Sequence, residues 1–191
     1  MPKINYTDQQ LLDFSEEHLM YELNILQWLA DAISKTEKGF QLSAYLESFA
    51  VHLRGLIDFL YTDPKNARED DLVAADFFGS PATWSPGELS ATLDKARKRM
   101  NKEVGHITYQ RKTGMHPDKP WPISALFKEI LPVLRKFATE ASGKKLHAKV
   151  LAWAITDDAK ILTLAVSAST SASNTAVVAV VGTSFPPTGT K

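Results

Sequence analysis

One arginine and one histidine in the middle of the chain have the chemistry needed to cut a phosphodiester bond without a metal ion. Arg99 and His106 have six residues between them. A guanidinium can hold phosphate through paired hydrogen bonds, and an imidazole can move a proton near neutral pH. On an ideal α-helix the two side chains would lie about 20° apart around the axis and about 10 Å apart along it. The spacing therefore predicts a paired site on one flank of a helix.

The residues around this pair form a basic patch in a chain that is neutral as a whole. Lysine plus arginine total 22 and aspartate plus glutamate total 22, so general attraction to nucleic acid is not expected. Locally, seven cations face two carboxylates: Lys95, Arg97, Lys98, Arg99, Lys102, Arg111 and Lys112 against Asp94 and Glu103. Such a patch is typical of phosphate contact. We expect RNA to bind here, with Arg99 and His106 as catalytic residues and Asn101, Lys102, Tyr109 and Arg111 as RNA-binding residues.

Other histidines leave a metal site open as an alternative. Glu103 and His106 form a Glu-x-x-His pair of the kind used by carboxylate-bridged metal centres in helical bundles, but the chain has no second such pair. His18, His52 and His106 could converge with Glu22 in a mixed site. We assign no metal ligands and no cofactor, and we keep a His/carboxylate metal-binding bundle as one hypothesis. The chain has no cysteine and no glycine-rich phosphate loop or nucleophile elbow, so those chemistries are not expected.

Apolar residues at three- and four-residue spacing predict the helices that must position these side chains. We expect helices over 7–34, 40–61, 85–107 and 123–139, and a weaker one over 144–155. The first begins at a capping box of Thr7 and Gln10. The third is expected to begin at Ser85, with Pro86 in the first turn and Glu88 completing the box.

This pattern predicts an all-α fold, an antiparallel bundle of four to five helices that occupies residues 1–155. A long acidic loop over 63–85 joins the second helix to the third, with a short helical turn near 72–78. Residues 156–191 are rich in Ser, Thr, Ala and Val, and we expect a flexible, disordered tail. No apolar run reaches the ~20 residues of a membrane span, and the first residues lack a secretory signal, so the expected location is the cytoplasm without membrane contact.

The first helix carries apolar residues on two sides. One seam holds Leu12, Leu19, Leu23, Leu26, Ala30 and Ile33; the other holds Leu11, Phe14, Tyr21, Ile25 and Trp28. A helix of this kind is either central in its domain or shared with another molecule. A non-enzymatic helical interaction protein, as a homodimer or bound to another partner, is therefore a competing hypothesis.

The arrangement of Arg99 and His106 resembles the HEPN superfamily of small helical-bundle proteins. The signature of that superfamily is an Arg and a His separated by four to six residues, often with a polar residue directly after the Arg. In this chain the separation is six, Met100 follows Arg99, and the polar Asn101 comes one position later. The resemblance covers about residues 7 to 140 in helix order and about ten residues in motif.

The resemblance implies a metal-independent endoribonuclease of a toxin or defence type, and other members bind RNA without cutting it. It also implies a symmetric homodimer in which both Arg-His pairs line one cleft, and an antitoxin or other protein as a further partner.

Overall fold

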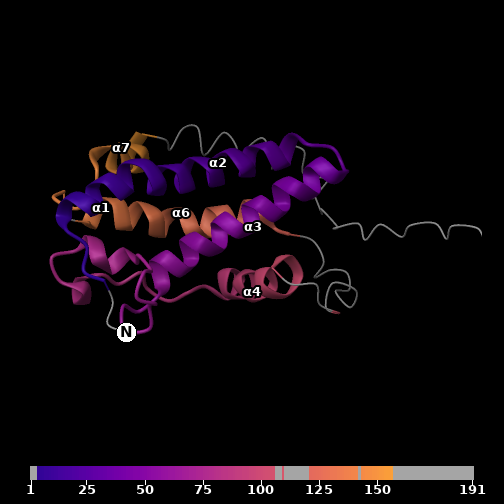
Figure 1. Ribbon diagram of the computed structural model, residues 1–191. Helices are drawn as coiled ribbons and strands as arrows, with labels where there is room; N and C mark the ends of the chain where they lie inside the picture. Colours follow the sequence, from indigo (N-terminus) through magenta and orange to yellow (C-terminus); the bar gives the residue numbers. More distant parts are fainter. Residues whose placement is uncertain (1–3, 106–108, 110–120, 142, 157–191) are drawn as a thin grey trace, which may run out of the picture.

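The computed structural model describes residues 4–105, 109, 121–141 and 143–156, and within these residues it is helical and contains no strand (Figure 1). The first helical stretch comprises α1 (Asp8–Phe14), a π-helical turn η1 (Ser15–Leu19) and α2 (Met20–Lys35). The predicted capping box is confirmed: Gln10 N donates to the Thr7 hydroxyl, and Thr7 N donates to the Gln10 side chain. A helix was expected here, but the extra residue of the π turn was not.

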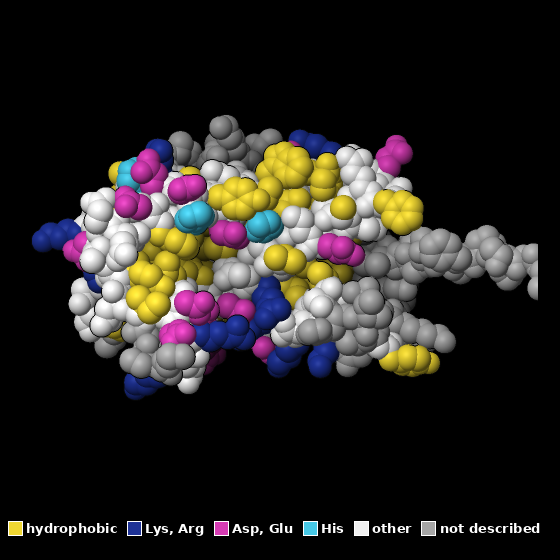
Figure 2. Space-filling view, viewed as in Figure 1, with side chains coloured by type: hydrophobic (Ala, Val, Ile, Leu, Met, Phe, Trp, Pro, Cys, Tyr) yellow, Lys and Arg dark blue, Asp and Glu magenta, His cyan; other side chains and the backbone are white. Residues whose placement is uncertain are grey.

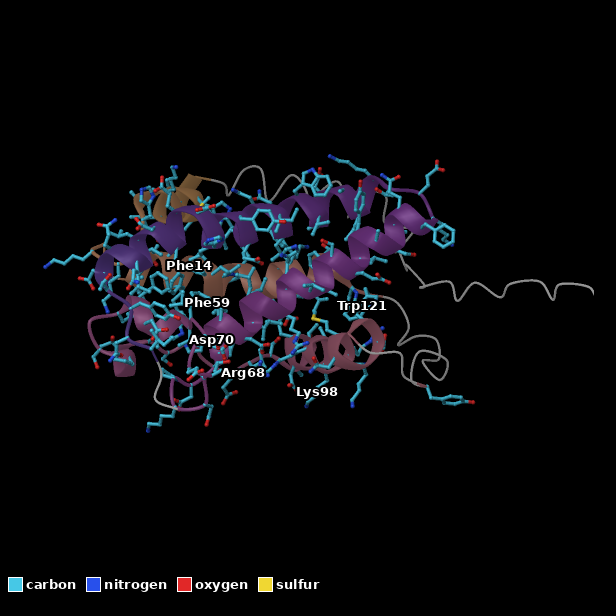
Figure 3. All side chains as sticks on the ribbon, viewed as in Figure 1. Phe14, Phe59, Arg68, Asp70, Lys98 and Trp121 are labelled. Carbon is cyan, nitrogen blue, oxygen red and sulfur yellow. The ribbon has the colours of Figure 1, made fainter. Side chains whose placement is uncertain are left out.

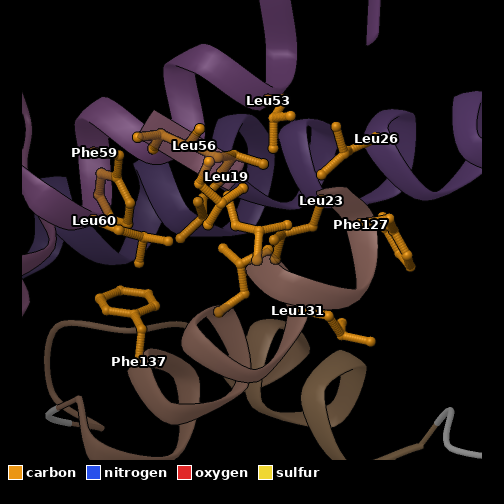
Figure 4. Packing of buried hydrophobic residues seen from close by; sticks show 14 of the residues in the cluster. Leu19, Leu23, Leu26, Leu53, Leu56, Phe59, Leu60, Phe127, Leu131 and Phe137 are labelled. Carbon is orange, nitrogen blue, oxygen red and sulfur yellow. The ribbon is translucent and has the colours of Figure 1, made fainter. Parts of the chain in front are cut away.

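The core lies where α2 packs along α3 (Phe40–Tyr61) and both contact α6 (Ile123–Glu140). The bounds of α3 match the prediction, and α6 continues through Pro132 to one residue beyond the predicted end. Figure 4 shows leucines of α2 and α3 pointing toward α6, where Phe137 lies below Leu60. These side chains are buried because the apolar stripe of each helix repeats every three or four residues and so stays on one side.

The chain after α3 is largely exposed over 63–71, and from Val73 onward it covers one end of the core. It contains two 3-10 turns, η2 (Ala74–Phe77) and η3 (Pro81–Thr83), the first of which replaces the helical turn expected at 72–78. The indole of Trp84 donates to the Leu60 carbonyl at 2.8 Å. Five aromatic rings from this segment, α3 and α6 pack mainly edge to face, and they are Phe59, Phe77, Phe78, Trp84 and Phe137.

The third predicted helix begins later than expected. α4 spans Ala91–Arg99, and its N-cap is Ser90, whose hydroxyl accepts from Leu93 N at 3.1 Å. The prediction of Ser85 as the cap was wrong. Gly87 adopts φ +81, a left-handed conformation that cannot belong to a right-handed helix. The Ser85 carbonyl instead accepts from Lys136 Nζ at 2.6 Å, which holds this segment against α6.

The last helix, α7 (Ala148–Thr156), begins four residues later than predicted and packs against η1 and α6. Ser15 in η1 is the only fully buried polar side chain among the described residues. Its hydroxyl donates to the Leu12 carbonyl and accepts from His147 N, each at 2.9 Å. Lys149 pairs with Glu16 at 2.7 Å beside this contact. The π turn and the start of α7 are therefore fixed to each other.

Within the residues that the structure describes, none of the helices is both long and apolar enough to cross a membrane. The predicted tail, 156–191, lies outside the described residues except for Thr156 at the end of α7.

The revised start of α4 predicts unequal effects for two serine substitutions. Ser90→Ala removes the cap and the hydrogen bond that Ser90 donates to Glu129, so we expect the free energy of unfolding to fall by about 1–2 kcal/mol. Ser85→Ala keeps the backbone carbonyl that accepts from Lys136, so it should change the free energy of unfolding by less than about 0.5 kcal/mol. Urea denaturation measures both, and equal losses would restore Ser85 as a cap.

Candidate functional site

Arg99 lies at the C-terminal end of α4, and a carboxylate and an indole hold its guanidinium. Nε donates to Glu103 Oε1 at 3.0 Å and Nη2 donates to Oε2 at 2.9 Å. The Arg99 side chain is 14% exposed and that of Glu103 is 24% exposed. The guanidinium carbon lies 4.3 Å from the centre of the Trp121 ring, within the range of a cation–π contact. The charged group is thus fixed in orientation on two sides.

The turn that carries Glu103 is π-helical. η4 spans Met100–Val104, and Gly105 N donates to the Met100 carbonyl at 2.9 Å, five residues back. The α-helix expected to continue to Ile107 therefore ends at Arg99. A π turn holds more residues than an α turn, so the angle of 20° predicted for Arg99 and His106 does not apply. His106 lies outside the described residues, and its position relative to Arg99 remains a prediction.

The predicted RNA-binding residues are described only in part. Asn101 is half-buried and Lys102 exposed, and both belong to η4, next to Arg99. Tyr109 is 73% exposed, as a base-stacking residue would need to be. Arg111 lies outside the described residues. The structure therefore brings three of the predicted residues into one turn: Arg99, Asn101 and Lys102.

Among the described residues, at least three cations of the basic patch are engaged in ion pairs. Arg97 reaches Asp58 of α3 at 2.9 Å, Lys98 pairs with Asp94 at 2.5 Å, and Arg99 pairs with Glu103. Arg54, one turn before Asp58 on α3, also approaches it, at 3.5 Å. The patch keeps a positive balance, because segment 94–103 has five cations and two carboxylates.

Exposed lysines line the outer side of this segment. Lys95, Lys98 and Lys102 are all exposed and are spaced three and four residues apart, so they share one side of the helix. In Figure 3, Lys98 lies on the side of α4 that faces away from α3, and Trp121 lies on the side of α4 that faces α3. The outer row of lysines and the guanidinium of Arg99 are the elements that could meet a polyanion.

Of the residues predicted to share a metal site, the structure brings together one histidine and one glutamate. His52 Nδ1 lies 2.8 Å from Glu22 Oε2, and the Tyr21 ring packs edge-on against His52. His18 is exposed and packs on Phe14 instead. Among the residues that the structure describes, no three His, Asp or Glu side chains are arranged to hold a metal ion. His106 is not among them, so convergence of His18, His52 and His106 is untested.

Among the described residues, two groups elsewhere have shifted pKa values. A hydrogen bond from Lys149, with the nearby charges of His147 and Lys149, lowers the pKa of Glu16. Burial raises the pKa of Tyr61, and the Glu129 carboxylate adds to this effect. Neither group belongs to α4 or η4, so the case for the Arg99 site is geometric.

Trp121 is a site residue that the sequence interpretation missed. It precedes α6 by two residues and is 4% exposed. Its only sequence signal is its place between Pro120 and Pro122, which marks a break in the helix and does not indicate a partner.

Comparisons of the chain with protein-family models, curated proteins and solved structures give no match. The assignment of the site therefore depends on its own residues.

A double-mutant cycle tests whether the Arg99–Glu103 pair is more than a surface ion pair. Because both side chains are largely buried and the pairing is bidentate, Arg99→Ala and Glu103→Ala should couple by about 1 kcal/mol in the free energy of unfolding. The matched pair Lys98–Asp94 has the same spacing and more exposure, and should couple by about 0.3 kcal/mol. Equal coupling energies, measured in urea, would contradict the assignment.

Proposed function

We propose that this chain is a HEPN-like RNA-binding protein that acts in the cytoplasm as a metal-independent endoribonuclease of a toxin or defence type. Its helices would form the antiparallel bundle expected from the sequence. The observation that supports the proposal is the guanidinium of Arg99, which Glu103 and Trp121 hold in a fixed orientation on a helical segment that also carries three exposed lysines. In sequence, His106 comes two residues after the end of η4.

Each residue has a defined role in this proposal. Arg99 binds the scissile phosphate and stabilises the charge that develops on it. His106 transfers a proton as general acid or base, which removes the need for a metal-bound water. Lys102 and Arg111 contact neighbouring phosphates, Asn101 hydrogen-bonds to the nucleotide, and Tyr109 stacks on a base. An antitoxin or other protein partner would control the activity.

Cleavage in chelator tests this proposal. A labelled single-stranded RNA in EDTA should be cut by the wild type, and His106→Ala or Arg99→Ala should lower the rate by about 10²–10⁴-fold. His18→Ala and Arg54→Ala are the matched controls, because each removes the same residue type from an exposed position on another helix. Cleavage by His106→Ala at the wild-type rate, or no cleavage by any of the proteins, would rule out the nuclease.

A second function, self-association, is favoured by exposed aromatic and aliphatic side chains on α2 and α3. We call Tyr21, Trp28, Phe40, Tyr45 and Val51 the aromatic strip. Four of them are more than half exposed: Tyr21 by 56%, Trp28 by 51%, Phe40 by 81% and Val51 by 59%. Trp28 packs edge-on against Tyr45, which joins the two helices across the strip. Figure 2 shows hydrophobic side chains and histidines together on this face.

The size of the aromatic strip suits a second copy of the chain. With about 200 Å² for each aromatic side chain, the exposed parts of Tyr21, Trp28 and Phe40 sum to about 400 Å². A standard interface buries about 800 Å² on each partner and is about 57% apolar, which requires about 450 Å² of apolar surface. The five residues of the aromatic strip carry no charge themselves. We propose a homodimer through this face, as the second seam of the first helix led us to expect.

Sedimentation equilibrium tests the dimer. The wild type should sediment as a dimer, and Trp28→Glu should be monomeric because it places a charge in the centre of the apolar contact. Ile155→Glu is the matched control, since Ile155 is an apolar residue of α7 that is 69% exposed and does not belong to the strip. A monomeric wild type, or a Trp28→Glu protein that still dimerises, would remove this function.

A further inference from the structure

The edge of the Arg99 guanidinium formed by Nε and Nη2 is the group that would bind an RNA phosphate. In this structure both N–H groups donate to the Glu103 carboxylate. We propose that Glu103 is an intramolecular competitor, whose carboxylate covers the anion-binding edge of Arg99 until an RNA phosphate displaces it. This inference rests on the proposed RNA-binding function. It assigns Glu103 the role of setting affinity for the polyanion.

The first argument is geometric. Nε and Nη2 of Arg99 form two parallel hydrogen bonds to the two carboxylate oxygens, at 3.0 and 2.9 Å. Phosphate offers two oxygens in a similar fork and binds guanidinium in the same bidentate way. The two anions therefore compete for the same two N–H groups.

The second argument is that Arg99 keeps a support when Glu103 leaves. The Trp121 ring lies under the guanidinium at 4.3 Å and is itself almost fully buried. The backbone carbonyl of Trp121 accepts from Ile123 N at 2.9 Å, which fixes Trp121 to the start of α6. Stacking on an aromatic face orients the plane of the guanidinium without using its in-plane N–H groups. A phosphate would thus meet a guanidinium that is already oriented.

The third argument concerns the position of Glu103 in the helix. It lies in the last turn, η4, which ends at Val104. The C-terminal end of a helix carries partial negative charge, so a carboxylate there is disfavoured by the backbone. Glu103 is also more exposed than Arg99, 24% against 14%, so water can solvate the carboxylate when it moves away. Arg99 is the interaction that retains it, and this makes exchange for a phosphate feasible.

RNA binding by isosteric variants tests the inference. All proteins carry His106→Ala, so that the probe, a fluorescein-labelled single-stranded RNA of about 20 nucleotides, stays intact during anisotropy measurements. Adding Glu103→Gln should tighten binding about tenfold. It should also steepen the dependence of log K on log salt by about 0.7, because one more cation is available to phosphate. The gain should vanish when Arg99→Ala is added.

Asp94→Asn is the matched control, because it also removes one carboxylate that is paired with a cation four residues away on the same helical segment. It should change RNA affinity by less than about twofold, since its partner Lys98 is exposed. An equal gain for Glu103→Gln and Asp94→Asn would overturn the inference, because net charge would then explain both. Weaker binding by Glu103→Gln would also overturn it, since Glu103 would then serve to position Arg99.

Inorganic phosphate separates failure of the inference from failure of the proposed function. Phosphate should raise the melting temperature of Glu103→Gln more than that of Asp94→Asn. If it does, and neither protein binds RNA, the masked anion site is supported and the RNA function falls. If RNA binds to the parent protein but Glu103→Gln gains neither RNA affinity nor phosphate stabilisation, the inference alone is wrong. Should Glu103→Gln fail to fold, Glu103→Ala provides the same comparison.

Discussion

The ring of Phe137 on α6 is the contact on which the arrangement of the other elements depends. It packs against aromatic rings from α3 and from the chain between α3 and α4, at centroid distances of 5.1 to 6.2 Å. Edge-to-face packing of this kind is directional, so the cluster fixes orientation as well as burying apolar area. Through it, a connection of nearly thirty residues becomes an ordered cover on the core. The end of that cover determines where α4 begins, and α4 in turn positions Arg99.

Much of the helical framework follows from the sequence, because apolar spacing reports directly on which side of a helix is buried. The bounds of α3 and the capping box before α1 were predicted on this basis and are confirmed. The start of α4 could not be predicted in the same way, since Ser85, followed by Pro86 and Glu88, carries a stronger local capping signal than the actual cap, Ser90. Lys136 and the left-handed Gly87, whose effects depend on distant packing, decide between them. The π turns were also missed, because one extra residue leaves the composition of a stripe almost unchanged.

For the candidate site, the sequence showed which charges are present but not how they pair. Spacing of four residues made an Arg99–Glu103 contact accessible, yet spacing alone does not distinguish it from a solvated pair such as Lys98–Asp94. The difference comes from Trp121, which follows a proline-rich segment whose path no local rule determines. Tyr21 and Trp28 of α2 were recognised as part of a second seam, whereas Phe40, Tyr45 and Val51 of α3 were not. Their exposure, however, depends on which helices cover them in three dimensions.

The bond between Ser15 and His147 has a consequence for how the chain is made. These residues are 132 positions apart, and the hydrogen bond that joins them closes nearly the whole folded length into one loop. During synthesis the first helix leaves the ribosome long before α7 is made. Until then the Ser15 hydroxyl and the apolar residues around it in η1 are not covered by α7. Closure of such a long loop is slow relative to local helix formation. The last described helix thus serves as the final closure of a domain whose other helices can already have assembled.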